Sequence, residues 1–305
     1  MYMLKKYLVF AFVAIFTSGL FLSCKDDKKD DEDGKIDPST IAASNLVAHF
    51  AFEGDGKDAI NALTPTNAAT TSVTFPDGRR GKGFQGTADA SKSGLLYSLP
   101  ANSKLRNLKA FSVSVWVKMV PNTVQTTDSP EQMVFHIDGT GDWIWGNLFL
   151  LQHRNWPLGE SERDRNYAEM DCFFFKEGVP WFGQRGNGWF IDVTAPQWKH
   201  IICTYDNATS QFHAYVNGVH VTAFDGSEYM GVDRKQSEDG PALGDLKFVG
   251  AERLAIGTWC TEIEEGWDWA SPFKGMIDEL RIYDRGLTAA EAKDLYDAEV
   301  TQVNE

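Results

Sequence analysis

The sequence predicts an all-β fold: a two-sheet antiparallel sandwich, in one domain over residues 44–305, with one short C-terminal helix. Two observations predict it. From Ser44 onward, apolar residues recur at every second position in most segments, which is the period of a strand with one buried face. Only one segment, near the end, has helical spacing. The 305 residues are 43% apolar and 13% aromatic, enough to bury a core.

Three segments carry the strongest strand patterns. Residues 110–117 alternate without a break, and the odd-numbered positions are apolar. Residues 198–205 are apolar on both faces, which is typical of a central strand covered on both sides. Residues 273–283 form a further predicted strand. Because many strands accompany a single helix, a sandwich of two packed sheets is favoured.

A tight turn and a helix start have clear local signals. Asn217-Gly218 separates two apolar runs, 211–216 and 219–224, and this dipeptide is the strongest short hairpin signal because both residues accept positive φ. Near the end, Thr288 and Glu291 have the spacing of a capping box. The apolar stripe that follows predicts the C-terminal helix: Ala292, Leu295 and Tyr296.

The N-terminus predicts an exported lipoprotein. Two lysines precede an apolar run at residues 8–16, which is too short to span a bilayer but typical of a signal peptide. The run continues into LFLSC, which resembles a bacterial lipobox with Phe21 where Leu is usual. We therefore expect a signal peptide at residues 1–23 and a lipid on Cys24. The alternative is an ordinary signal peptide with an incidental cysteine.

An acidic, lysine-containing tether is expected at residues 24–43, because its composition leaves nothing to pack. Lys25 followed by Asp26 and Asp27 resembles the surface-export signal of Bacteroidota lipoproteins. That resemblance implies a lipid-anchored protein of the outer membrane facing the cell exterior, and a plain periplasmic spacer is the alternative. The net charge of −14 repels phosphate backbones and speaks against nucleic acid as a partner.

Four segments, in order, resemble the laminin-G-like, concanavalin A-type jelly-roll domain of bacterial surface proteins. They are LVAHFAFEGDGKDA with GRRGKGFQG downstream, FSVSVWVK, QWKHIICTYDNATSQFHAYVNGVHV, and FKGMIDELRIYDRGLTAAEAKDLY. The resemblance implies a concanavalin A-like jelly-roll fold but no single function, because this fold hosts lectins, adhesive modules, glycosidases and lyases. A long insertion follows the second segment, with strand-like runs at 147–152, 170–175 and 179–182.

Tryptophan is concentrated in the insertions. Eight of the ten lie there: Trp143, Trp145, Trp156, Trp181, Trp189, Trp259, Trp267 and Trp269. Indoles stack on sugar rings while polar neighbours bind the hydroxyls. We expect five residues to contribute to a ligand face: Trp143, Trp145, His153, Arg154 and Trp156. The alternative is that these tryptophans fill hydrophobic space beneath long loops.

The sequence contains no recognisable catalytic motif. The E-x-D-x-x-E spacing of glycosidases with this fold is missing, and so is a G-x-S-x-G elbow. Two carboxylates could still converge from separate loops, as glycoside hydrolysis requires. His136 and His153 are better site candidates than the four histidines on other predicted strands. Cys172 and Cys203 are expected to be buried, and a Cys172–Cys260 bridge is left open.

A structural calcium ion is expected near the two ends of the domain. Strand alternation places four side chains on one face: Met276, Asp278, Leu280 and Ile282. A lone carboxylate among apolar groups is costly unless something neutralises it. The resemblance to related jelly rolls implies that Asp278 binds Ca²⁺ with Glu53 and with Asp55 or Asp58. The alternative is that Asp278 is bound by backbone amides or by an arginine from elsewhere.

These expectations define one function and two alternatives. We expect a non-catalytic, surface-anchored lipoprotein that binds polysaccharide and holds it near the outer membrane for neighbouring degrading or uptake proteins. The first alternative is a glycoside hydrolase or polysaccharide lyase, which would release reducing ends or unsaturated products. The second is a structural or adhesive module whose insertions bind protein.

Overall fold

The computed structural model describes residues 36–68, 70–87, 93–119, 131–139, 146–153, 167–179, 185–192, 197–221, 240–260 and 270–301. The predicted signal peptide, the lipobox cysteine Cys24 and most of the tether lie outside these ranges. Within them, no helix is both long enough and apolar enough to cross a membrane.

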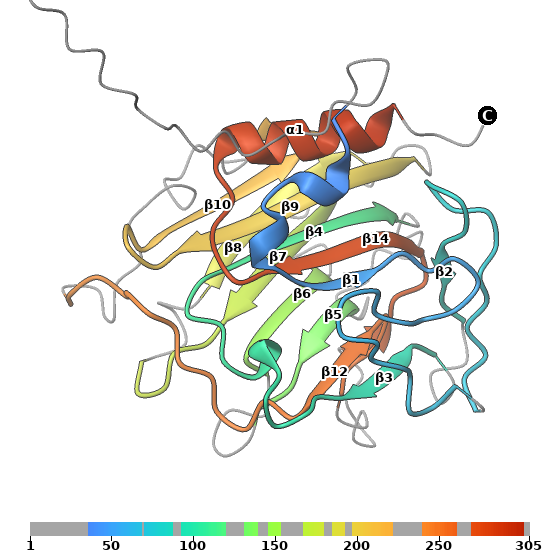
Figure 1. The fold of residues 1–305 in the computed structure, drawn as a ribbon, viewed down its shortest axis with the longest axis horizontal. Coiled ribbons are helices and arrows are strands. Elements are labelled where there is room, and N and C mark those ends of the chain that lie inside the picture. Colours follow the sequence, from blue (N-terminus) through green and yellow to red (C-terminus); the bar gives the residue numbers. More distant parts are fainter. Residues whose placement is uncertain are drawn as a thin grey trace, which may run out of the picture.

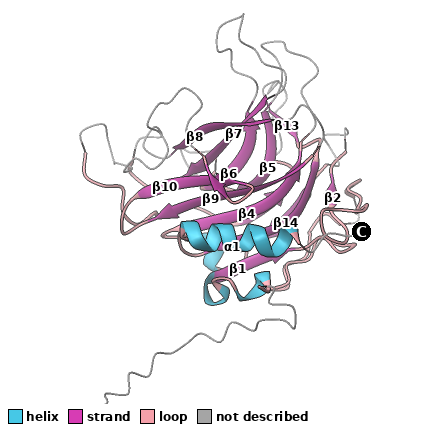
Figure 2. Ribbon diagram, turned by 90° about the horizontal axis from the view of Figure 1, so that it is seen from above, coloured by secondary structure: helices cyan, strands magenta, loops and turns pink. Residues whose placement is uncertain are grey.

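Two sheets pack against each other, and one helix lies on the outside of the first (Figures 1 and 2). The first sheet has the strand order β1-β14-β4-β9-β10-β11, with β2 paired to β14, and all of its pairs are antiparallel. Its strands are β1 (Leu46–Phe50), β2 (Phe84–Gln85), β4 (Phe111–Lys118), β9 (Trp198–Asp206), β10 (Gln211–Val216), β11 (Val219–His220) and β14 (Met276–Tyr283).

The second sheet has the order β3-β12-β5-β6-β7-β8 and is antiparallel except for β13, which pairs in parallel with β5. Its strands are β3 (Leu95–Ser98), β5 (Glu131–Ile137), β6 (Leu148–His153), β7 (Tyr167–Phe174), β8 (Arg185–Asp192), β12 (Arg253–Ile256) and β13 (Ala270–Pro272). The helices among the described residues are α1 (Ala289–Val300) and three short 3₁₀ turns, η1 (Pro38–Thr40), η2 (Ala43–Asn45) and η4 (Lys104–Arg106). The predicted all-β, two-sheet sandwich with one short C-terminal helix is confirmed.

The segments with uninterrupted patterns form the elements that they predict. The alternating apolar side chains of β4 all face the core between the sheets. β9 lies inside the first sheet, with Cys203 facing that core and Ile202 facing a smaller cluster under α1. Asn217 (φ 52°) and Gly218 (φ 73°) form the predicted hairpin turn. Both hydrogen bonds of the capping box at Thr288 are present.

The predicted insertion supplies four consecutive strands of the second sheet, β5, β6, β7 and β8, which run from its interior to one edge. The runs at 147–152 and 170–175 are confirmed as β6 and β7. The run predicted at 179–182 is not confirmed: Val179 lies in a bend and residues 180–182 lie outside the described residues. The strand lies instead at β8, where glycines at 186 and 188 remove two side chains from the pattern.

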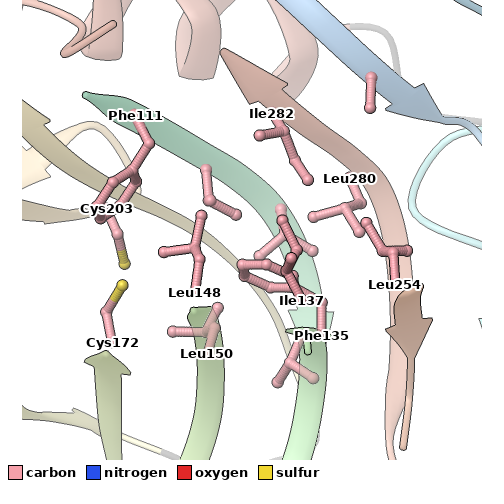
Figure 3. Packing of buried hydrophobic residues seen from close by; sticks show 14 of the residues in the cluster. Phe111, Phe135, Ile137, Leu148, Leu150, Cys172, Cys203, Leu254, Leu280 and Ile282 are labelled. Atoms are coloured by element: carbon pink, nitrogen blue, oxygen red, sulfur yellow. The ribbon is translucent and has the colours of Figure 1, made fainter. Parts of the chain in front are cut away.

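The core between the sheets is apolar and aromatic, with Phe111, Leu148, Leu254 and others shown in Figure 3. In Figure 3 the sulfur atoms of Cys172 on β7 and Cys203 on β9 point toward one another across this core. Cys260 lies on the other side of the second sheet, where its amide contacts His136. The two cysteines of the suggested Cys172–Cys260 bridge therefore face opposite sides of one sheet.

The predicted face of Asp278 is wrong, because β14 contains a bulge. Glu279 has a left-handed backbone (φ 48°), and the pairing of β14 with β4 shifts register between Asp278 and Arg281. Ile277 and Leu280 both face the core, so Asp278 and Glu279 lie together on the outer face. A bulge reverses the alternation, and simple counting along the strand does not anticipate it.

Candidate functional site

The outer face of the second sheet carries a cluster of its own, separate from the core between the sheets. It contains Met133, Phe149, Leu151 and Trp259, with Phe173 packed against them. Strand pairing places Phe149 of β6 between His136 of β5 and Phe173 of β7. We call the side chains of His136, Phe149, Phe173 and Trp259 the aromatic face.

The four rings of the aromatic face contact one another. Phe149 stacks on Phe173, with ring centroids 4.7 Å apart and planes inclined by 16°. Trp259 follows β12 and lies 5.7 Å from Phe149 and 5.1 Å from the ring of His136. Phe149 and Trp259 are buried, whereas Phe173 is only partly buried. Phe173 is therefore the ring of this cluster with the most surface left for a ligand.

His136 and Cys260 contact each other but do not form a reactive pair. The amide of Cys260 donates to Nδ1 of His136 at 3.1 Å, so Nε2 carries the proton in the neutral ring. The thiol of Cys260 donates to the carbonyl oxygen of His136 at 3.3 Å. Burial raises the pKa of the Cys260 thiol well above its usual range. A protonated thiol bound to a carbonyl is a packing group, because the nucleophile is the thiolate.

Two acids, Glu169 and Asp171, lie two positions apart on β7, the strand that carries Phe173. Asp171 is buried and pairs with Leu151, which belongs to the outer cluster. Glu169 pairs with His153, two positions further along the strand. Their E-x-D spacing matches the first two acids of the glycosidase pattern, but Phe174 holds the position of the third and faces the core. The sequence did carry a signal for this pair, two acids at alternate positions at the start of the strand-like run 170–175.

A charged pair lies next to the aromatic face. Asp138 follows β5, and its carboxylate accepts a hydrogen bond from the side-chain Nε of Arg253 at 2.7 Å. The same carboxylate accepts the backbone amides of Glu252 and Arg253 at 2.8 and 2.7 Å. The Arg253 side chain is half exposed. Its remaining N–H donors can therefore reach a hydroxyl or carboxylate of a ligand.

Most of the predicted ligand residues lie outside the described residues: Trp143, Trp145, Arg154 and Trp156. His153 is described as the last residue of β6, opposite Glu169. Residues 140–145 join β6 at its start and residues 154–166 join it at its end.

The predicted calcium ligand Asp278 is held by backbone amides. Its Oδ2 accepts the amides of Arg79 and Arg80 at 2.8 and 2.9 Å, and its Oδ1 accepts the amide of Glu279 at 2.8 Å. The turn that carries Arg79 and Arg80 packs closely against this carboxylate, because a Cβ added to Gly78 would lie 2.6 Å from Oδ2 of Asp278. Burial raises the pKa of Asp278 to about 8, although these amides lower it.

The other predicted metal ligands are also bound by N–H groups. Glu53 accepts the amide of Lys82 at 3.1 Å, and Asp55 accepts that of Lys57 at 2.9 Å. Asp58 accepts three amides at 2.9 Å. Over the described ranges, no group of three or more His, Cys, Asp or Glu residues is placed to hold a metal. These residues do not fit a calcium ion, because N–H donors face their oxygens. Calcium stays a prediction.

A serine, a histidine and a glutamate meet under α1, on the outer face of the first sheet. Nε2 of His200 lies 2.7 Å from Ser114 Oγ and 3.4 Å from Glu299 Oε2. Nδ1, which the acid of a catalytic triad would hold, has no hydrogen-bond partner among the described residues. All three side chains are fully buried, and burial lowers the pKa of His200 to about 3. This contact is structural.

The same face buries a network of charges, which we call the helix network. Arg281 of β14 binds Glu299 of α1 on one side and Glu279 at 2.6 Å on the other. His49 of β1 contacts Glu279 at 2.7 Å, and Trp116 Nε1 donates to Glu299 at 2.7 Å. Each charge has an opposite charge beside it, so the network fastens α1 to the sheet and leaves no group directed at a ligand.

Comparisons with known sequences agree with this fold. The family model described as the concanavalin A-like lectin/glucanases superfamily matches residues 183–293, a stretch that contains β9, β10 and β14. This match supports a concanavalin A-like lectin/glucanase domain in the chain. A comparison with curated proteins finds no match.

Several solved structures are similar to this chain. The ligand-binding domain of botulinum neurotoxin serotype D, in complex with N-acetylneuraminic acid, has a TM-score of 0.52 at 13% identity, covering 85% of this chain and 52% of that chain. The binding domain of paraclostridial mosquitocidal protein 1 has a TM-score of 0.51 at 15% identity, covering 84% and 52%. Domain 4 of an extracellular arabinanase from Geobacillus stearothermophilus, in complex with arabinotriose, has a TM-score of 0.47 at 22% identity, covering 83% and 98%. The chain spans about half the length of the two toxin domains. At these identities the likeness shows the fold alone.

Proposed function

We propose that this chain is a non-catalytic glycan-binding protein whose ligand lies on the aromatic face. The observation that carries the proposal is the stacked pair Phe149–Phe173, with Phe173 partly exposed on the outer surface of the second sheet. Aromatic rings offer flat apolar surfaces to the C–H faces of sugars. The half-exposed guanidinium of Arg253 supplies polar contacts nearby.

The comparisons support this proposal through the fold. The concanavalin A-like sandwich is shared with the serotype D neurotoxin domain that was crystallised with N-acetylneuraminic acid. Among the described residues, α1 and the helix network cover the outer face of the first sheet around Arg281. The ligand is therefore expected on the second sheet.

A catalytic role is the second candidate, and Glu169 and Asp171 favour it. They lie two positions apart on β7, where they pair with His153 and Leu151 of β6. Glycoside hydrolysis needs two carboxylates across the scissile bond, and a substrate on the aromatic face would pass over β7. Release of reducing ends or unsaturated products would identify an enzyme, whereas a binding protein leaves the polysaccharide intact.

The binding test is affinity electrophoresis of the lipid-free protein, made with Cys24→Ser and without residues 1–23, against plant, algal and host polysaccharides. Phe173→Ala should weaken binding severalfold, since stacking contributes about 1 kcal/mol or more per ring. Lys293→Ala, an exposed change on α1, is the matched control and should bind as the wild type does. Retained binding in Phe173→Ala, with loss only on changing Trp143, Trp145 or Trp156, would move the site to the predicted tryptophans.

The proposed location is the outer membrane, with the domain held at the cell surface by lipid on Cys24. Two or more acyl chains hold a protein on a membrane stably. Cys24→Ala should release the protein from membranes or leave its signal uncleaved. Replacing Lys25, Asp26 and Asp27 by alanine should keep the lipid but remove surface exposure, measured by protease digestion of whole cells. A mature, membrane-bound Cys24→Ala protein would contradict the anchor.

A further inference from the structure

We propose that His213 and His220 form a binding site for a divalent transition-metal ion of the zinc, copper or nickel class. The two residues lie on the neighbouring strands β10 and β11, on either side of the Asn217-Gly218 turn. Nδ1 of His213 and Nε2 of His220 are 3.1 Å apart. The pair is separate from the aromatic face, since it belongs to the first sheet.

The distance between the two nitrogens suits a single metal ion. Zinc binds histidine nitrogen at about 2.0–2.1 Å, so two nitrogens 3.1 Å apart subtend an angle of about 98° at the ion. That angle lies between the values of square-planar and tetrahedral coordination. The two ring planes are inclined by 59°, and binding one ion requires each ring to rotate until both lone pairs point at it.

The hairpin holds the two imidazoles in place before any metal arrives. His220 pairs directly with Tyr215, whose ring meets that of His220 edge-on at 5.3 Å. The tight turn requires positive φ at both of its residues, and a Cβ on Gly218 would lie 2.9 Å from the ring of Tyr296. Preorganised ligands bind more tightly, because little freedom is lost on binding.

Both histidines are available as ligands at neutral pH. Burial lowers the pKa of His213, and proximity to His220 lowers it further. Burial also lowers the pKa of His220. The neutral imidazole is the form that binds metal. His220 is exposed, so an ion can enter from solvent.

The donor atoms define the class of metal and the kind of site. Imidazole nitrogen suits zinc, copper and nickel, whereas calcium and magnesium require oxygen ligands. In the described part of the chain, His213 and His220 have no third His, Cys, Asp or Glu placed to complete a metal site. Such a site fastens β11 to β10 and stabilises the folded protein in proportion to metal occupancy.

The test is titration of the wild type, freed of metal by EDTA and dialysis, with ZnCl₂ at pH 7.5, followed by isothermal calorimetry and thermal unfolding. We expect one saturable site and a rise in Tm, with no such rise from CaCl₂ or MgCl₂. His213→Asn and His220→Asn should each weaken zinc binding by at least about tenfold, because each removes a ligand. Val219→Thr changes an exposed neighbour of the same shape and should bind zinc as the wild type does.

Each outcome decides for or against the site. His220 is exposed, so His220→Asn should keep the metal-free Tm and far-ultraviolet spectrum of the wild type. Loss of zinc binding in that folded variant supports the proposal. No saturable binding to the wild type overturns it, and the 3.1 Å contact is then a hydrogen bond between two rings. Undiminished binding in both asparagine variants also overturns it and places the metal elsewhere.

Discussion

The outer faces of the two sheets are closed in different ways. On the first sheet, the short helix α1 covers a network of buried charges centred on Arg281. On the second sheet, rings from β5, β6, β7 and the segment after β12 cover one another, and Phe173 stays partly exposed. The first face packs against its own helix, so its charged side chains pair with one another. The second is the face that retains surface for a ligand.

This difference shows that a buried cluster of chemical groups is not by itself a site. Ser114, His200 and Glu299 have the residue types of a triad, but they are fully buried under α1 and held in a structural role. The aromatic face has only one such group, the buried His136, yet its ring Phe173 is partly exposed at the surface. The following predictions test this contrast, starting with the largest expected effect.

Breaking the helix network should cost the most stability. Glu299→Ala removes one carboxylate from Arg281 and the acceptor of Trp116 Nε1, which leaves buried donors without partners. Removing one partner of a buried ion pair costs about 3–5 kcal/mol, measured by urea unfolding. Lys293→Ala, which breaks an exposed pair on the same helix, should leave the free energy of unfolding unchanged. Equal effects of the two changes would contradict the network's role.

Changes on the aromatic face should separate stability from binding. Phe149 is buried between two rings, so Phe149→Ala should lower the free energy of unfolding by about 3 kcal/mol. Phe173 is partly exposed, and Phe173→Ala should lower it by only about 1 kcal/mol while weakening glycan binding severalfold. If Phe173→Ala lost much stability but bound glycan as the wild type does, Phe173 would have a packing role and the proposed binding site would be wrong.

Acid should destabilise the helix-covered face through His200. Burial lowers the pKa of His200 to about 3 in the folded state, below the ordinary value of 6.5. Its contribution to stability is therefore complete above pH 6.5 and is lost as pH falls toward 3, by about 1.4 kcal/mol per pH unit. The His200→Gln variant lacks this pH dependence. The difference in free energy of unfolding between wild type and variant, measured with urea, should therefore shrink as the pH falls from 7 to 4. A constant difference would show that His200 does not take up the proton.

The calcium prediction has the smallest expected effect. Because amide N–H groups face the oxygens of Asp278, the geometry predicts that neither CaCl₂ nor EDTA shifts the Tm. Asp278→Asn should lower the Tm equally with and without calcium. A rise in wild-type Tm with calcium that EDTA reverses and Asp278→Asn abolishes would instead confirm the metal site implied by the family resemblance.

The sequence predicted elements well wherever the pattern was local and unbroken. The alternation of β4, the Asn217-Gly218 turn and the capping box at Thr288 all depend on neighbouring residues, and all are confirmed. The prediction of which side chains face the core failed on β14, where one bulged residue reversed the alternation of the strand. Glu279, with its positive φ, moved Asp278 to the opposite face, and no local signal announces such a bulge.

The candidate site was less accessible from the sequence, because its members come together only through sheet pairing. Phe149 and Trp259 belong to segments far apart in the chain and meet because β12 and β6 flank β5. The predicted ligand residues Trp143, Trp145, Arg154 and Trp156 lie outside the described residues, so their grouping stays a prediction.

The sequence by itself determined that the chain forms strands, where the tightest turn lies and where the helix begins. These features depend on backbone preferences and on side-chain alternation within a few residues. Only the tertiary structure decided what each outward face meets. Alternation assigns side chains to two faces of a strand but does not say what covers either face. The helix α1 covers the outer face of the first sheet around Arg281. The order of strands in the second sheet brings the rings of the aromatic face together on its outer face.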